Sequence, residues 1–174
     1  GLLSVHIPQS AYNILQAAVP EAMVEIDETE QLFCCTESLA KYNAIAVGPG
    51  IGKKKSMVQA LELIMRNTDS PKVFDADALN ILSENKSMFK LFNHSDILTP
   101  HPKEFDRLTK IHHSHFDRIQ SGIEFAKQYK VIIVLKGAHT AIIDTAGIVV
   151  FNSTGNPSMA KGGSGDALTG IILG

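Results

Sequence analysis

A glycine-rich stretch from residue 152 to residue 170 carries the most distinctive chemistry in the chain. It runs N-S-T-G-N-P-S-M-A-K-G-G-S-G-D-A-L-T-G and holds five of the 13 glycines. The apolar run from Ala167 predicts a buried helix, so residues 162–165 stand at a loop-to-helix junction. Such a junction directs unpaired backbone N–H groups and the positive end of a helix dipole at one spot, and glycines let a ligand come close. We therefore predict that it binds an anion, most simply a phosphate.

Asp166 follows this glycine cluster directly. A carboxylate beside a phosphate repels it unless the carboxylate takes part in the reaction. Accepting a proton from a substrate hydroxyl fits this position. The alternative is that Asp166 lies in the first helical turn and stabilises the helix through its charge. The spacing alone does not decide between the two interpretations.

Four further loops with glycines or reactive side chains each follow a predicted strand. They are G-P-G-I-G at 48–52, D-A-D-A-L-N at 75–80, T-P-H-P-K-E at 99–104 and K-G-A-H-T at 136–140. In open α/β sheets, ligands bind outside the carboxyl ends of the strands. The four loops and the glycine-rich junction together predict one site at one edge of one sheet.

The first two of these loops have competing interpretations. The run 48–52 is neither a P-loop, since Lys54 stands where Ser or Thr should hold the metal, nor a G-x-G-x-x-G fingerprint. A tight turn without a ligand remains the alternative. Asp75 and Asp77, with Asn80, could orient a metal-bound water or a sugar hydroxyl. Asp77 could equally be a plain helix N-cap.

Histidine and lysine mark the other two loops. Two prolines fix the path around His101, which we predict to donate to a ligand. Lys136 could neutralise a phosphate while Gly137 permits close approach, although a surface lysine and a turn glycine would look the same. A second histidine group, at 112, 113 and 115, lies between two predicted helices. We interpret them as a solvated loop rather than a metal site.

Apolar runs of two lengths alternate along the chain and predict the elements that position these loops. Predicted strands cover residues 2–5, 23–26, 44–47, 72–75, 96–98, 131–135, 141–144 and 148–151. Predicted helices cover residues 10–18, 53–66, 103–109, 115–129 and 167 onward, with residues 81–92 helical in pieces. Strand–helix alternation indicates a three-layer α/β/α sandwich with a mostly parallel sheet, and the last two strands form an antiparallel edge hairpin.

The bulk properties describe an ordinary globular chain of 174 residues, with 44% hydrophobic and 20% charged residues. A net charge of −2 gives no general attraction to nucleic acid or to an anionic membrane, and no apolar run is long enough to span a bilayer. Cys34 and Cys35 are adjacent, which is not a metal-binding spacing and fits a reducing, cytoplasmic compartment. We expect residues 1–174 to form a single domain. The apolar residues at both ends lead us to expect a polypeptide truncated at both.

The loop motifs, taken in their order along the chain, resemble those of a known enzyme family. The motifs are G-P-G-I-G, D-A-D-A-L-N, L-T-P-H-P-K-E-F, V-L-K-G-A-H-T and G-N-P-S-M-A-K-G-G-S-G-D. From about residue 44 to residue 174 the chain resembles the NAD(P)H-hydrate dehydratases of the ribokinase-like superfamily, which is related to carbohydrate kinases. The G-G-S-G-D motif alone would indicate only the superfamily.

The resemblance implies repair of NAD(P)HX, the hydrated form of NADH or NADPH. Water is removed through a phosphorylated intermediate at the expense of ADP or ATP, with Mg²⁺ bridging the phosphates and no protein side chain required as a metal ligand. Asp166 would be the catalytic base. The residues implied to face the substrate are Gly50, Gly52, His101 and Asp166. Those implied to hold the adenine nucleotide are Lys136, Gly137, Ala138, His139, Thr140, Asn156, Gly162, Gly163, Ser164 and Gly165.

The resemblance leaves several points open. Two residues depart from the family pattern. Lys161 stands where a small or hydroxylated residue is expected, and Ser158 stands where a glycine is expected. The alternative functions are a vitamin-precursor or sugar kinase of the same superfamily and a nucleotide-binding module without turnover. The family also implies a homo-oligomer, often a tetramer, with no nucleic-acid or membrane partner.

Overall fold

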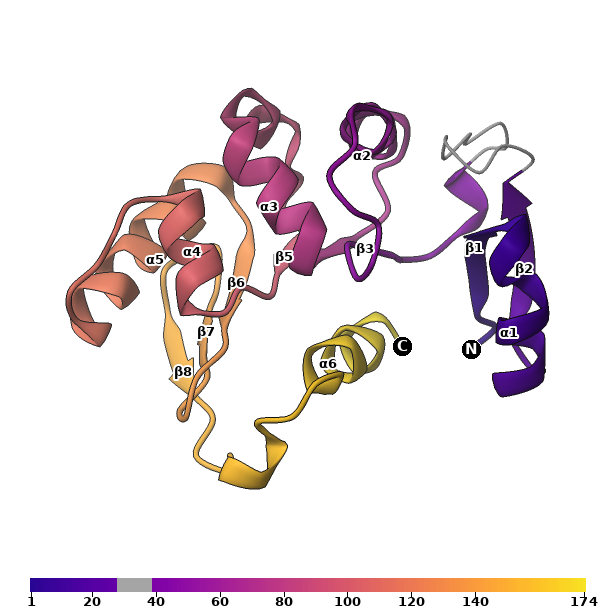
Figure 1. Cartoon of the computed structure of the whole chain (residues 1–174). Coiled ribbons are helices and arrows are strands. Elements are labelled where there is room, and N and C mark those ends of the chain that lie inside the picture. Colours follow the sequence, from indigo (N-terminus) through magenta and orange to yellow (C-terminus); the bar gives the residue numbers. More distant parts are fainter. Residues whose placement is uncertain (28–38) are drawn as a thin grey trace.

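The structure, a computed structural model, describes residues 1–27 and 39–174. Six strands form one sheet in the order β3-β4-β5-β6-β7-β8, and β1 and β2 form a separate two-stranded parallel sheet (Figure 1). The strands are β1 Ser4–Pro8, β2 Met23–Asp27, β3 Ile45–Val47, β4 Lys72–Phe74, β5 Ile97–Leu98, β6 Ile132–Leu135, β7 Ala141–Ile143 and β8 Val149–Phe151. The α-helices are α1 Tyr12–Ala18, α2 Lys55–Asn67, α3 Ala76–Glu84, α4 Pro102–Leu108, α5 His115–Tyr129 and α6 Ser164–Leu173.

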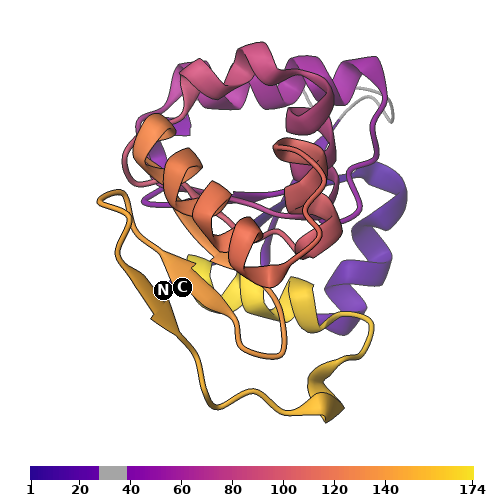
Figure 2. The ribbon, with the colours of Figure 1, turned by 90° about the vertical axis from the view of Figure 1, so that its left-hand side faces the viewer.

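The predicted α/β architecture is confirmed. Strands β3 to β6 are parallel, and β7 and β8 add an antiparallel hairpin at one edge. Helices α2 and α3 lie on one side of this sheet and α6 on the other (Figure 1), as the view turned by 90° also shows (Figure 2). The prediction for Cys34 and Cys35 lies outside the described residues. Short 3-10 turns cover Gln9–Ala11, Leu39–Lys41, Lys86–Leu91 and Pro157–Met159.

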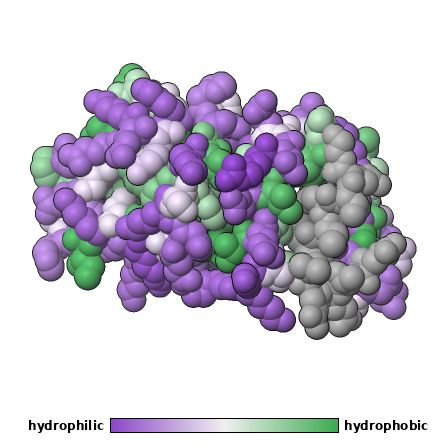
Figure 3. Space-filling view, turned by 90° about the horizontal axis from the view of Figure 1, so that it is seen from above, coloured by the Kyte–Doolittle hydropathy of each residue, from purple (hydrophilic) through white to green (hydrophobic). Residues whose placement is uncertain are grey.

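Apolar side chains of β4 to β7 and of the helices above them form the core. Phe74, Leu98 and Ile133 on neighbouring strands are fully buried. Helix α2 turns Leu61 and Ile64 to the sheet, as its apolar stripe predicts. Seen from above, the outer surface over these helices is mainly hydrophilic (Figure 3), as expected for amphipathic helices on a sheet.

A buried ion pair at the amino ends of β4 and β5 was not predicted. Lys72 Nζ lies 3.7 Å from Asp96 Oδ1, and neither side chain is more than 1% exposed. Asp96 also accepts the backbone N–H groups of Lys72 and Asn93. Burial outweighs these contacts and raises the pKa of Asp96. The pair ties the starts of two strands at the edge opposite the predicted site.

The interpretation of the second histidine group as a solvated loop is wrong for His112. Its side chain is 1% exposed, its Nδ1 lies 2.8 Å from Asp106 Oδ1, and its ring stacks on Phe105. Arg118 on α5 contacts both carboxylate oxygens of Asp106 on α4, at 2.9 and 3.0 Å. His112 is buried because this cluster joins the two helices around it.

Replacing Asp106 by asparagine is expected to lower the free energy of unfolding by about 1–2 kcal/mol at pH 7, because the charged bond to Arg118 is lost. Arg118 holds the folded pKa of Asp106 below its ordinary value. The contribution of Asp106 to the free energy of unfolding is therefore present at pH values above its unfolded pKa. It is lost as pH falls through the lowered folded pKa of Asp106. Urea unfolding of Asp106→Asn and wild type across the acid range measures this, with exposed Asp69→Asn as the control. A difference that persists in strong acid would contradict the assignment.

Candidate functional site

The four loops singled out in the sequence leave the same edge of the six-stranded sheet. Each follows one of β3, β4, β5 and β6, which are parallel and adjacent in that order. The register pairs Val47 with Phe74 and Phe74 with Leu98, so the strands end at nearly the same level. Chain order and sheet order coincide here, and each loop therefore lies beside the next.

The first two loops interlock through backbone contacts. Gly48 has φ +140°, and a Cβ built on it would lie 1.8 Å from the carbonyl oxygen of Asp75. The backbone N–H of Gly52 donates to Asp77 Oδ2 at 2.9 Å. Asp77 therefore stabilises the glycine turn at residues 48–52 by accepting this hydrogen bond. The predicted N-cap role of Asp77 is wrong, because Asp75 occupies the N-cap position of α3.

Asp75 is the buried centre of this edge. Its carboxylate accepts from Lys136 Nζ at 2.7 Å through Oδ1 and from Thr169 Oγ1 at 2.8 Å through Oδ2. Burial by itself raises the pKa of Asp75. The hydrogen bond and charge of Lys136, together with Thr169 and Thr99, outweigh burial and hold the pKa below its ordinary value. Asp75 is therefore an ionised group that joins β4, β6 and α6.

The ammonium group of Lys136 is committed to acidic partners within the described residues. Besides Asp75, it lies 4.0 Å from Glu104 Oε2, and the side chain is 22% exposed. A Cβ built on Gly165 would lie 3.5 Å from the same Nζ. Lys136 thus lies directly under the first turn of α6. Its predicted contact with a phosphate remains a prediction, and much of its charge already faces Asp75.

His101 starts helix α4. Its Nδ1 accepts the backbone N–H groups of Lys103 and Glu104 at 3.1 and 3.3 Å, while the Glu104 side chain accepts the N–H of His101 at 2.8 Å. This reciprocal capping box fixes the ring, whose side chain is 45% exposed. Because Nδ1 is an acceptor, Nε2 is the nitrogen that carries the proton in a neutral ring. A donor role toward a ligand would fall to Nε2.

The glycine-rich stretch lies beside the loop after β6. The N–H of Asn152 donates to Thr140 O at 2.9 Å, and a Cβ on Gly155 would lie 2.8 Å from Ala138 O. The Asn156 side chain accepts from the N–H and hydroxyl of Ser158. Two segments predicted to hold the same nucleotide are therefore neighbours in space.

The junction into α6 is a glycine loop followed by a helix, as predicted, but the helix starts at Ser164 rather than Ala167, and only Thr169 in it is buried, so the predicted buried helix is wrong. Gly163 has φ +85° and is the N-cap, and α6 starts at Ser164, whose hydroxyl donates to Met159 O at 2.6 Å. Five glycines at this edge have nothing within 4 Å of a built Cβ, so a ligand could approach their Cα atoms closely. They are Gly50, Gly52, Gly137, Gly162 and Gly163.

Asp166 lies in the first turn of α6 and is exposed. Within residues 1–27 and 39–174 its carboxylate forms no ion pair. A Cβ built on its neighbour Gly165 would lie 3.5 Å from Lys136 Nζ and 3.6 Å from Asp75 Oδ2. Asp166 therefore follows directly the residue of α6 that lies over this pair, and its predicted role as catalytic base remains a prediction.

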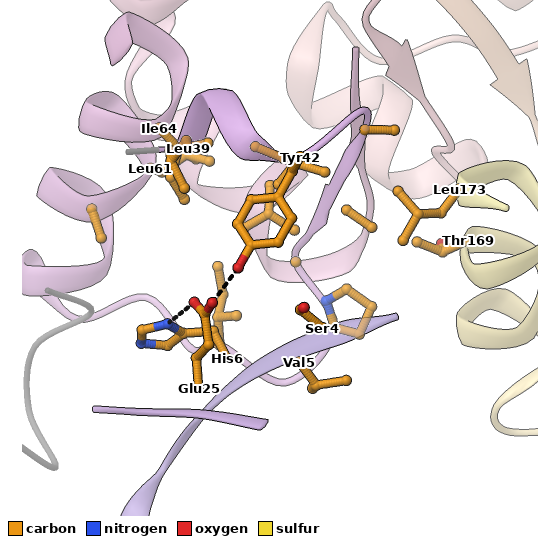
Figure 4. Close-up of a pocket in the computed structure, with 18 of the residues that line it drawn as sticks. Ser4, Val5, His6, Glu25, Leu39, Tyr42, Leu61, Ile64, Thr169 and Leu173 are labelled. Atoms are coloured by element: carbon orange, nitrogen blue, oxygen red, sulfur yellow. Dashed lines mark hydrogen bonds and ion pairs between the residues drawn. The ribbon is translucent and has the colours of Figure 1, made fainter. Parts of the chain in front are cut away.

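A cavity adjoins this edge without coinciding with it. It measures about 560 Å³ and lies between the β1–β2 sheet, β3, α2 and α6 (Figure 4). Tyr42 donates to Glu25 on its wall, and the hydrogen bonds from Lys41 and then Tyr42 lower the pKa of Glu25. Most of its lining is apolar. Gly48 and Thr169 border it, but no residue predicted to hold the adenine nucleotide does, so we do not assign the nucleotide to it.

Two site residues were missed in the sequence. Thr169 is buried, and Glu104 is 7% exposed with its carboxylate near Lys136. A hydroxyl residue in the apolar run A-L-T-G-I-I-L is an available signal, because a buried hydroxyl needs a hydrogen-bond partner. Glu104 could have been found as the fourth residue of a capping box.

Solved structures share this fold. The ADP/ATP-dependent NAD(P)H-hydrate dehydratase from Bacillus subtilis, co-crystallised with ATP/Mg²⁺ and soaked with CoA, superposes with a TM-score of 0.83 at 33% identity, covering 100% of this chain and 63% of that chain. A ribokinase-like superfamily protein from Enterococcus faecalis V583 gives a TM-score of 0.81 at 28% identity, covering 99% and 60%. The fold is therefore ribokinase-like.

Sequence comparison narrows this class to one family. The family model described as NAD(P)H-hydrate dehydratase matches residues 1–174, and the chain belongs to that family. The bifunctional NAD(P)H-hydrate repair enzyme of Moorella thermoacetica is 35% identical over 184 residues, 100% of this chain and 35% of that protein. The ADP-dependent (S)-NAD(P)H-hydrate dehydratase of Bacillus subtilis is 41% identical over 135 residues, 76% of this chain and 47% of that protein. The chain thus spans about a third to a half of these curated relatives.

Proposed function

We propose that this chain belongs to an enzyme that dehydrates NAD(P)HX to NADH or NADPH at the expense of ADP or ATP. The observation that carries the proposal is the glycine-lined start of α6 beside Asp166, whose carboxylate forms no ion pair within the described residues, in a chain matched over its whole length by the dehydratase family. The relatives named above are repair enzymes of this kind. We also propose a single ribokinase-like domain, in the cytoplasm, within a homo-oligomer. Within residues 1–27 and 39–174, no helix is long and apolar enough to cross a membrane.

The chemistry follows from the groups at the edge. Hydroxide is a poor leaving group, so the ring hydroxyl is first phosphorylated. Asp166 takes the hydroxyl proton while the oxygen attacks the terminal phosphorus, and the bond to the nucleotide breaks to release AMP from ADP or ADP from ATP. The ring nitrogen lone pair then expels phosphate as the C–O bond breaks. The resulting iminium ion loses a proton from the adjacent ring carbon to phosphate or water, and the new C=C bond restores the reduced nicotinamide. The backbone N–H groups of Gly163, Ser164 and Gly165 would stabilise the charge on the transferring group.

Magnesium would assist by neutralising charge on the nucleotide phosphates. In the part of the chain that the structure describes, no three histidine, cysteine, aspartate or glutamate side chains gather as a metal site. Asp75, the buried acid at this edge, is already bound by Lys136 and Thr169. The donor set therefore fits a metal held by phosphate oxygens and water.

A direct assay tests the proposal with the whole polypeptide that carries this chain. Hydrated NADH is incubated with ADP or ATP and Mg²⁺, and the returning absorbance of the reduced nicotinamide is followed alongside phosphate release. Recovery that depends on the nucleotide is the expected result. Phosphorylation of a vitamin precursor or sugar without recovery would instead support a kinase. Nucleotide binding without either reaction would indicate a binding module.

A further inference from the structure

The hydrogen bond between Thr169 and Asp75 has no part in the mechanism proposed above, although both residues are buried at the site edge. We propose that Asp75 is a positioning residue, which anchors helix α6 through Thr169 and so sets the orientation of Asp166 and of the backbone N–H groups at the start of α6. The kinetic part of this inference rests on the proposed dehydratase function.

The anchor is rigid on the sheet side. The N–H of Asp75 donates to Val47 O at 3.2 Å, and its carbonyl oxygen is packed against Gly48. The next residue, Ala76, has φ +47°, a backbone conformation that costs about 1–2 kcal/mol for a residue with a Cβ. The carboxylate is held on its other oxygen by Lys136 at 2.7 Å. Its remaining oxygen therefore has a fixed position from which to hold α6.

On the helix side, Thr169 is the sole buried residue of α6. The loop that leads into the helix adds little packing of its own, since Gly162 and Gly163 have nothing within 4 Å of a built Cβ, and the Ser164 hydroxyl bonds only within this segment, to Met159 O. Asp166 and Thr169 are three residues apart, so they lie on the same face of the helix. Fixing the rotation of α6 at Thr169 therefore fixes the direction of the Asp166 face relative to the sheet edge.

The valine substitution at Thr169 tests the anchor with little change in shape. Thr169→Val removes the bond to Asp75, and we expect kcat to fall about tenfold to a hundredfold, since small misplacements of reacting groups have effects of this size. KM for ADP or ATP should stay within about threefold. Thr169→Ser keeps the hydroxyl and should keep kcat within about threefold of wild type. Equal kcat for Thr169→Val and wild type would overturn the proposal.

Asp96 provides a matched control for substitution of Asp75. Asp75→Asn and Asp96→Asn each neutralise a buried aspartate paired with a lysine, one at the site edge and one at the opposite edge of the sheet. Both are expected to destabilise the fold. Only Asp75→Asn should lower kcat, measured well below the unfolding temperature of each variant. A loss of kcat in Asp96→Asn equal to that in Asp75→Asn would mean that general destabilisation, not positioning, is responsible.

A measurement without turnover separates this proposal from the proposed function. Hydrogen–deuterium exchange of the backbone N–H groups of residues 162–168 should be at least about fivefold faster in Thr169→Val than in wild type, and unchanged in Thr169→Ser. If wild type shows no dehydration but the exchange difference is present, the proposed function fails and the anchor stands. Unchanged exchange in Thr169→Val would refute the anchor whatever the activity.

Discussion

Asp166→Asn is expected to lower kcat for nucleotide-driven dehydration by about a thousandfold or more, while the Kd of ADP or ATP stays within about threefold. General-base catalysis of this kind contributes about 10²–10⁴-fold. In the proposed mechanism the carboxylate acts on the substrate hydroxyl, whereas backbone groups of the neighbouring loops would hold the nucleotide. Single-turnover kinetics and calorimetric titration of the nucleotide measure the two quantities separately. The amide is nearly isosteric with the exposed carboxylate, so folding should not change.

Two results would count against this role. A parallel loss of nucleotide binding would mean that Asp166 organises the junction rather than the chemistry. Unchanged turnover would support the interpretation of Asp166 as a helix-stabilising charge. Asp69→Asn, at an exposed position outside the site, is the matched control and should leave both quantities unchanged.

Gly48→Ala is expected to have the largest effect on stability, with a loss of about 4 kcal/mol or more in the free energy of unfolding. The added methyl would lie 1.8 Å from Asp75 O, and φ at this position is +140°. The obstacle is backbone at the end of a buried strand, which cannot rotate away as a flexible side chain can. Urea unfolding of the purified variant, or its failure to accumulate as folded protein, measures the effect.

Alanine substitutions at two other glycines of the same edge distinguish the effect of steric clash on stability from the effect of backbone conformation. Gly50 has φ +71° and open space around a built Cβ. We therefore expect Gly50→Ala to lower the free energy of unfolding by about 1–2 kcal/mol, from backbone conformation alone. Gly137 has open space around a built Cβ and no positive φ. Gly137→Ala should therefore change the free energy of unfolding by less than about 0.5 kcal/mol. If Gly48→Ala cost no more than Gly50→Ala, the close packing of the β3 and β4 loops would be wrong.

The sequence predicted most of the fold because its signals are local. Short apolar strands, an amphipathic α2 and the T-A-G turn between β7 and β8 each appear within a few residues. The helix at 115–129 was also predicted. Its buried face uses Ile119, Phe125 and Ala126, with Phe125 packed edge-on against Phe89. Which side of a helix meets the core depends on the partners that it finds there.

The sequence predicted which loops form the site, but not the hydrogen bonds and ion pairs that join their side chains. The rule that ligands bind at strand carboxyl ends places the loops together without any knowledge of contacts. The bond from Thr169 to Asp75 joins residues 94 positions apart, and that from Lys136 to Asp75 joins residues 61 apart. No local pattern encodes which acid a distant lysine or threonine will meet. His112 was misassigned for the same reason, because its burial depends on Arg118 reaching back from α5.

The order of the strands has a consequence for how the protein is made. Strands β3 to β8 pair with their successors along the chain, so each can add to the growing sheet as it leaves the ribosome. Helix α6 comes after all of them and yet returns to β3 and β4. The junction at the start of α6, which we propose to bind phosphate, therefore forms late, on a sheet already assembled. We expect a nascent chain halted before residue 164 to form the sheet without this junction, and refolding to recover strand structure before it recovers nucleotide binding.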